Sequence, residues 1–143
     1  LIDQRAKRRA DIDYWIKGYD GADLKTGEYR CVPPRIPAMS KINADIDRIG
    51  AAVKTWQECY NRYVTNLNAA MPLTKRIPAD IQKLMNRKET EESTAYLAQL
   101  QVNLSEEAKV SSKLLLADFD AWRRATEAYV TEHNGMVKDA SKR

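Results

Sequence analysis

Apolar residues recur along residues 40–71 at alternating spacings of four and three positions. An α-helix turns by about 100° per residue, so this spacing places all of them on one face. Ser40 is a favourable N-cap and Pro72 supplies a stop, and together they predict one long helix over residues 40–71. The apolar stripe of this helix consists of Ile42, Ile46, Ile49, Val53, Trp56, Tyr60, Tyr63 and Leu67.

A second apolar stripe predicts another long helix over residues 90–134. Asn134 and Gly135 are expected to form the usual left-handed stop at its end. Ser105 and the two glutamates after it resemble a fresh helix start, but the stripe keeps its phase through them, so the pattern leaves a break at this point open. The second stripe consists of Leu97, Leu100, Leu104, Ala108, Ser111, Leu115, Phe119, Trp122, Thr126, Tyr129 and His133.

The segments outside these helices complete an all-α architecture. Residues 1–17 are predicted to form a shorter helix, residues 18–39 turns and a proline-rich extended segment, and residues 135–143 a flexible tail. The connection over residues 72–89 is short, so the two long helices are expected to be antiparallel. The 143 residues are therefore predicted to form one domain, a long antiparallel helical hairpin with the N-terminal helix and the extended segment packed on it.

The two long helices also resemble each other in sequence. Residues 51–71 align with residues 117–137, and 6 of the 21 aligned positions are identical, including Trp56 with Trp122. Amphipathic helices of similar composition resemble one another without a common origin. The alignment therefore leaves an internal duplication open.

Composition and charge narrow the class of protein. Hydrophobic residues make up 43% and charged residues 31% of the chain, which is typical of a folded domain rather than a disordered one. The longest apolar run, from Leu114 to Ala117, is four residues long, so no transmembrane segment is predicted. The formal net charge of +4 favours contact with anionic surfaces without requiring it.

The two cysteines bracket the proline-rich segment and the first half of a long helix. From Cys31 to Ser40, nine extended steps of roughly 3.1 Å cover about 28 Å. From Ser40 to Cys59, nineteen helical steps of about 1.5 Å also cover about 28 Å. If the chain reverses near Met39, the two sulfur atoms meet. We therefore predict a Cys31–Cys59 disulfide, whose 29-residue loop stabilises the fold by roughly 3.5 kcal/mol.

A disulfide implies an oxidising compartment, so the predicted location is periplasmic or secreted. The alternative is a cytosolic protein with two reduced, buried thiols. A zinc site is not predicted, because two cysteines and one histidine are fewer than the four ligands that structural zinc requires.

Candidate catalytic residues are few. His133 is the only histidine, and its place at the end of a helical stripe is typical of a packing or helix-terminal residue. The turn between Asp20 and Glu28 lacks the acid spacing of a calcium-binding loop, and the chain has no phosphate-binding loop and no nucleophile motif. We therefore predict no enzyme activity, no catalytic residues, no metal site and no cofactor; a helical enzyme acting through His133 is the least favoured hypothesis.

Basic residues gather near the N-terminus and around the connection between the long helices. A Cys31–Cys59 bond would bring both clusters toward one end of the hairpin. Such a surface would bind lipopolysaccharide, anionic lipid or nucleic acid by counterion release, although an ordinary solvated surface is the favoured explanation of these residues. The candidate polyanion-binding residues are Arg5, Lys7, Arg8, Arg9, Lys75, Arg76, Lys83, Arg87 and Lys88.

Three aromatic residues near the N-terminus, Tyr14, Trp15 and Tyr19, do not fall on one helical face. Some are expected to pack on the hairpin, and the others would form a platform for a partner chain or a sugar. The leading hypothesis is a non-enzymatic interaction protein, such as an adaptor, assembly factor or inhibitor, that acts through a protein partner. A polyanion-binding module is the alternative, and the excess apolar face of the long helices also favours homo-oligomerisation.

Overall fold

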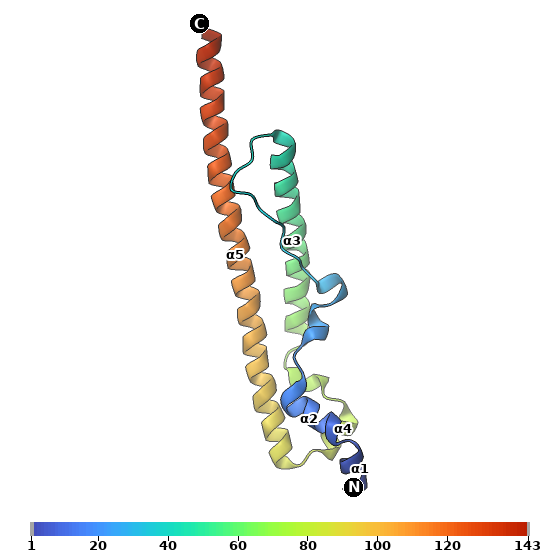
Figure 1. Ribbon diagram of the computed structural model, residues 1–143. Helices are drawn as coiled ribbons and strands as arrows, with labels where there is room; N and C mark the ends of the chain where they lie inside the picture. Colours follow the sequence, from blue (N-terminus) through green and yellow to red (C-terminus); the bar gives the residue numbers. More distant parts are fainter. Residues whose placement is uncertain (1, 143) are drawn as a thin grey trace. The chain divides into compact units, whose positions relative to one another are not determined.

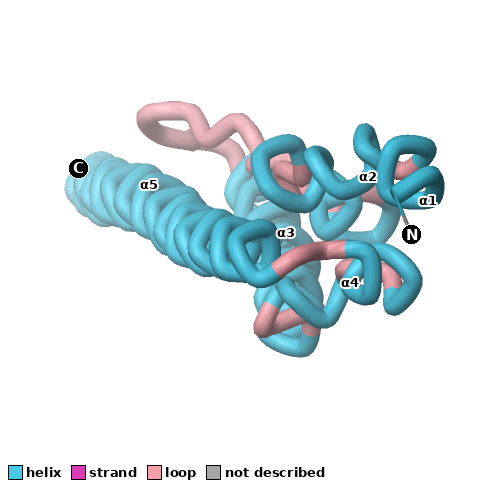
Figure 2. The backbone as a smooth tube through the Cα atoms, turned by 90° about the horizontal axis from the view of Figure 1, so that it is seen from below, coloured by secondary structure: helices cyan, strands magenta, loops and turns pink. Residues whose placement is uncertain are grey.

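The computed structural model describes residues 2–142, including the side chains of residues 3–136. All regular elements of the described chain are helices, which confirms the predicted all-α class (Figure 1, Figure 2). The chain forms two compact units, and each unit combines segments that are distant in sequence. The first unit contains residues 2–30 and 62–109, and the second contains residues 31–61 and 110–142.

Two long helices, α3 (Asn43–Ala69) and α5 (Arg87–Lys142), each contribute one segment to each unit. In the second unit the two segments run antiparallel, since α3 descends where α5 rises in Figure 1. Their apolar stripes meet there, and Ile49 and Val53 of α3 are buried with Trp122 of α5. The alternating spacing of apolar residues thus locates most core positions of both helices, but Ile42, at the start of the first stripe, is 63% exposed, and Ser111 and His133 of the second stripe are exposed.

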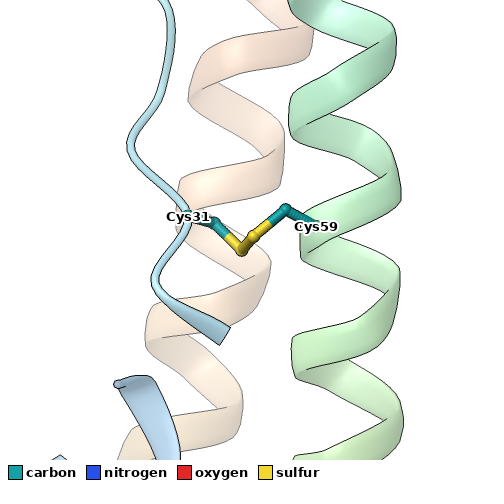
Figure 3. The surroundings of a disulfide bond; sticks show 2 residues. All are labelled: Cys31 and Cys59. Atoms are coloured by element: carbon teal, nitrogen blue, oxygen red, sulfur yellow. A yellow bond between two sulfur atoms is a disulfide. The ribbon is translucent and has the colours of Figure 1, made fainter. Parts of the chain in front are cut away.

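The proline-rich segment of the second unit has no regular structure. Its Cys31 is bonded to Cys59 of α3, with the two Cα atoms 5.7 Å apart (Figure 3). Ile36, midway along the segment, packs against the core of this unit. The predicted Cys31–Cys59 disulfide is therefore confirmed.

Ser40 anchors the far end of this segment and does not cap α3. Its backbone N–H donates a hydrogen bond to Thr126 Oγ1 at 3.1 Å, and its hydroxyl oxygen accepts one from Trp122 Nε1 at 2.9 Å. The buried hydroxyl faces the indole of α5, and α3 begins only at Asn43, three residues beyond Ser40. The start predicted at Ser40 is therefore wrong, and the end at Ala69 comes two residues earlier than the predicted 71.

Helix α5 is longer than the sequence pattern predicts. It has no break at Ser105, and it continues past Gly135 to Lys142. Gly135 does not adopt the positive φ of a left-handed helix stop. A glycine inside a helix costs only about 1 kcal/mol relative to alanine, so the helix passes through it. The helix end predicted at residue 134 is therefore wrong: residues 135–142 are helical, and residue 143 lies outside the described residues.

Short helices make up the rest of the first unit. The helix predicted over residues 1–17 is interrupted, because Arg8 departs from helical geometry with φ −105° and ψ 15°. The observed elements are α1 (Ile2–Lys7), α2 (Arg9–Asp13), one π-helical turn (Tyr14–Gly18), 3₁₀ turns at Ala22–Lys25, Gly27–Tyr29 and Leu73–Arg76, and α4 (Ala79–Leu84).

The core of the first unit draws on all of its segments. Ile12, Leu73 and Leu97 are completely buried. The chain turns sharply at Gly21, whose φ is 74°, and a β-carbon at this position would lie 2.9 Å from Cδ1 of buried Leu104. Glycine is the residue that tolerates both the left-handed conformation and this close approach.

Candidate functional site

Most of the predicted basic residues form ion pairs. Six of the nine candidates have an acidic partner, whereas Lys7, Lys75 and Lys83 have none among the described side chains. Pairs of Arg5, Arg8 and Arg9 with α4 and α5 bring the two basic clusters together within the first unit. The pairs are Arg5 with Glu89, Arg8 with Asp11 and Asp80, Arg9 with Asp13 and Glu89, Arg76 with Asp23, Arg87 with Glu91, and Lys88 with Glu92.

Glu89 is the centre of this network. Its side chain, only 7% exposed, lies in the first turn of α5, where Oε1 accepts a hydrogen bond from Asn86 N–H at 2.9 Å. Glu89 N–H in turn donates to Asn86 Oδ1 at 2.8 Å, which completes a capping box. The same carboxylate binds Arg5 Nη1 at 2.9 Å and Arg9 Nη1 at 2.5 Å. We call Glu89 with these two arginines the Glu89 clamp.

The clamp keeps Glu89 ionised. Burial alone would raise the pKa of this carboxyl, because a desolvated charge is unfavourable. Hydrogen bonds from Arg5, from Asn86 N–H and from Arg9 outweigh burial and lower the pKa of Glu89 from 4.5 to about 2. The carboxylate is therefore charged at neutral pH, and it holds α1 and α2 against the start of α5.

Sequence reasoning missed Glu89. The pattern Asn86-x-x-Glu89 has the form of a capping box, so the start of α5 carried a usable signal. The arginines that bind Glu89 carry no such signal, since Arg9 is 80 positions away in sequence. Part of the N-terminal basic cluster thus has a structural role, because it fixes the segment that leads into the aromatic residues.

Tyr14, Trp15 and Tyr19 form a cluster of rings directly after α2. Tyr19 N–H bonds to Tyr14 C=O at 2.7 Å and closes a π-helical turn, which is wider than an α-helical one. The ring centroids of Trp15 and Tyr19 lie 4.8 Å apart, those of Tyr14 and Trp15 5.2 Å, and those of Tyr14 and Tyr19 6.0 Å. Tyr19 is buried, Trp15 is half-buried and Tyr14 is 43% exposed.

The three rings line a cleft of about 530 Å³ in the first unit. Ala69 and Ala70, at the end of α3, also line it. The volume is within the range of ligand pockets, about 300–1,000 Å³. We call this feature the aromatic cleft, and its charged residues are Asp20, Asp23, Lys75 and Arg76.

Asp23 links the ring of Tyr19 to the charged side chain of Arg76. Tyr19 Oη donates a hydrogen bond to Asp23 Oδ1 at 2.8 Å, and Arg76 pairs with Oδ2. Burial, and secondly the hydrogen bond to Asp23, raise the pKa of Tyr19, so the phenol stays protonated and remains a donor. Tyr96 Oη donates a hydrogen bond to Tyr19 C=O at 2.7 Å and so ties the backbone of Tyr19 to α5.

Two charges in the cleft have no counter-charge. Asp20 Oδ1 accepts a hydrogen bond from Ala22 N–H at 3.0 Å, which closes an Asx turn, but no described Lys or Arg forms an ion pair with this carboxylate. Lys75 likewise has no acidic partner in the described part of the chain. Both side chains belong to exposed residues, so the cleft presents one free carboxylate and one free ammonium group.

His133 does not line the cleft. It is exposed on α5, where its ring stacks on Tyr129 with the centroids 5.9 Å apart, and it is not helix-terminal because α5 continues beyond it. The described side chains contain no group of three or more His, Cys, Asp or Glu residues placed to hold a metal ion. No helix in the described chain combines the length and the apolar composition that crossing a membrane requires.

Comparison with known proteins finds no matching family model, no matching curated protein and no matching solved structure. The function proposed below therefore rests on the chemistry of the aromatic cleft and on the disulfide.

Proposed function

We propose that the protein is a non-enzymatic interaction protein of an oxidising, extracytoplasmic compartment, either periplasmic or secreted, and that it binds a protein partner through the aromatic cleft. Its role would be that of an adaptor, an assembly factor or an inhibitor. The observation that carries this proposal is the cluster of Tyr14, Trp15 and Tyr19 beside an open cleft.

The location is supported by the Cys31–Cys59 disulfide. Disulfides persist in secreted and periplasmic proteins, whereas thiol reductants of the cytosol keep cysteines reduced. Both cysteines of the chain are in this bond. An oxidising compartment is therefore the natural setting for the protein.

Recognition of a protein partner is supported by the chemistry of the rings. Tyr and Trp provide large contact areas at low cost in side-chain entropy, and they are enriched at the energetic centres of protein interfaces. Tyr14 exposes 43% of its surface, so its ring is available to a partner. Tyr19 is buried and contacts both other rings, so it holds the cluster in one geometry, which lowers the entropic cost of binding.

The ion pairs favour a protein partner over a polyanion. Acidic partners already neutralise Arg5, Arg9 and Arg76. Much of the positive field that a polyanion would require is therefore absent. Three lysines without an ion pair among the described residues remain, and they allow the two functions to be compared directly in a heparin-binding experiment. If the protein is retained on heparin at physiological salt, and reversal of Lys7, Lys75 and Lys83 to Glu abolishes retention, the polyanion function is supported in place of this proposal.

Selection from a displayed library of random peptides tests the proposal. The oxidised protein is used as bait beside its Tyr14→Ala variant, whose fold is checked by circular dichroism. We expect peptides that the native protein enriches and the variant does not. Equal enrichment by both baits, or no enrichment by the native protein, contradicts the proposal.

A further inference from the structure

We infer that the aromatic cleft selects partner segments that carry a basic group and an acidic group close together. This inference rests on the proposed function, since it names the chemistry of the segment that the cleft binds. It starts from the two cleft charges that no ion pair neutralises, the Asp20 carboxylate and the Lys75 ammonium group.

The Asp20 carboxylate is held in place before any partner arrives. Its Oδ1 accepts the Ala22 N–H at 3.0 Å, and the turn that follows is fixed by Gly21, whose φ is 74°. No hydrogen bond to Oδ2 occurs among the described residues, so this oxygen remains available to an incoming donor. A fixed acceptor of this kind loses little entropy when it binds a cation.

The surroundings of Asp20 also suit a cation. Ala69 and Ala70 line the cleft at the C-terminal end of α3, where the helix dipole contributes partial negative charge. Tyr14 and Trp15 present aromatic surface to the same cleft, and the faces of such rings attract ammonium and guanidinium groups. A lysine or arginine side chain of the partner therefore finds an acid, a helix end and aromatic rings together.

Lys75 favours an acidic group in the partner segment. Its neighbour Arg76 is already paired with Asp23, whereas the Lys75 ammonium group has no acidic partner in the described chain. A purely cationic segment would approach this ammonium group unfavourably, and a purely anionic one would approach Asp20 unfavourably. A segment with both charges satisfies both groups.

The test extends the peptide selection to two more baits, Asp20→Asn and Lys75→Gln. Asn retains the oxygen that accepts the Ala22 N–H, so the turn is preserved while the charge is removed. We expect the native protein to enrich peptides with a basic and an acidic position near each other. The Asp20→Asn bait should lose only the preference for the basic position. The Lys75→Gln bait should lose only the preference for the acidic position.

One enriched peptide is then measured by calorimetry in a double-mutant cycle. We expect Asp20→Asn to weaken its binding about two- to fivefold, and to have no further effect once the basic residue of the peptide is replaced by a neutral one. Enriched peptides without charged positions, or independent effects of the two changes, overturn this inference while leaving the proposed function standing if Tyr14→Ala still abolishes binding. If no peptide depends on Tyr14, the proposed function fails and this inference fails with it.

Discussion

Glu89→Gln tests whether the Glu89 clamp stabilises the protein through its charge. Glutamine has the same shape, and it still accepts the Asn86 N–H of the capping box. What it removes is the ionic attraction to Arg5 and Arg9, whose hydrogen bonds to the carboxylate are in part charge-assisted. The substitution therefore separates the clamp from the cap.

The magnitude follows from the pKa of Glu89, which is lowered from 4.5 to about 2. At about 1.36 kcal/mol per pKa unit this lowering corresponds to about 3 kcal/mol. The guanidinium groups are partly solvated, with side-chain exposures of 30% for Arg5 and 49% for Arg9, so we expect a loss of about 2 kcal/mol in the free energy of unfolding at pH 7. Glu89→Ala should lose about 1 kcal/mol more, because it also removes the cap.

The assay is urea unfolding of the oxidised protein, followed by circular dichroism, at pH 7 and at pH 3. The folded-state pKa lies below the unfolded-state pKa, so the stabilisation is complete above about pH 4.5 and is lost as the pH falls toward 2. The difference between native protein and variant should therefore shrink to less than half near pH 3.

Glu91→Gln is the matched control, because Glu91 pairs with Arg87 on the exposed side of α5 and should lose less than about 0.5 kcal/mol. A Glu89→Gln variant as stable as this control at pH 7 would refute the clamp. So would a stability difference that is unchanged at pH 3.

Further predictions concern single contacts, and each is measured by urea unfolding unless stated otherwise. Gly21→Ala should lower the free energy of unfolding by about 1–3 kcal/mol, because alanine strains the left-handed backbone and its β-carbon would contact buried Leu104. Gly27→Ala, at a position with open space around it, should show only the loss that comes from the strained backbone. Trp122→Phe should cost at least about 1 kcal/mol more than Trp56→Phe, because the Trp122 indole donates to a buried hydroxyl while Trp56 Nε1 has no described partner. Cys59→Ser should lower stability by roughly 3.5 kcal/mol, and mass spectrometry of the native protein after alkylation without reductant should show no added label.

The long helices and the disulfide could be predicted because they depend on local repeats and on chain lengths. The spacing of Ile49 and Val53 in one helix, and of Trp122 in the other, identifies the residues that form the core of the second unit. The disulfide is predicted by the similar lengths that the extended and helical arms would have on either side of Ser40, and the structure contains it although α3 begins three residues later. Such features require no knowledge of which side chains meet across the fold.

The aromatic cleft and the clamp could not be predicted in the same way. Tyr14 and Tyr19 are brought together by a π-helical turn, and a pattern of 3.6 residues per turn places them on different faces. The sequence predicts Arg5 and Arg9 as candidate polyanion-binding residues, because their partner, Glu89, is too distant in the chain to be recognised. The local sequence predicts Ser40 as the N-cap of α3, since nothing near Ser40 in the chain indicates its hydrogen bond with Trp122 on α5.

The position of the disulfide also determines what proteolysis does to this molecule. Arg30 and Arg35 are both exposed, and Cys31 lies between them. Cleavage after Arg35 opens the chain between the two bonded cysteines, so both fragments remain joined through sulfur as a covalent two-chain protein. Cleavage after Arg30 frees the residues that carry the aromatic rings from any covalent tie, and only ion pairs and packing would retain them. Two cleavage sites only five positions apart therefore differ in whether residues 1–30 stay covalently attached to the rest of the chain.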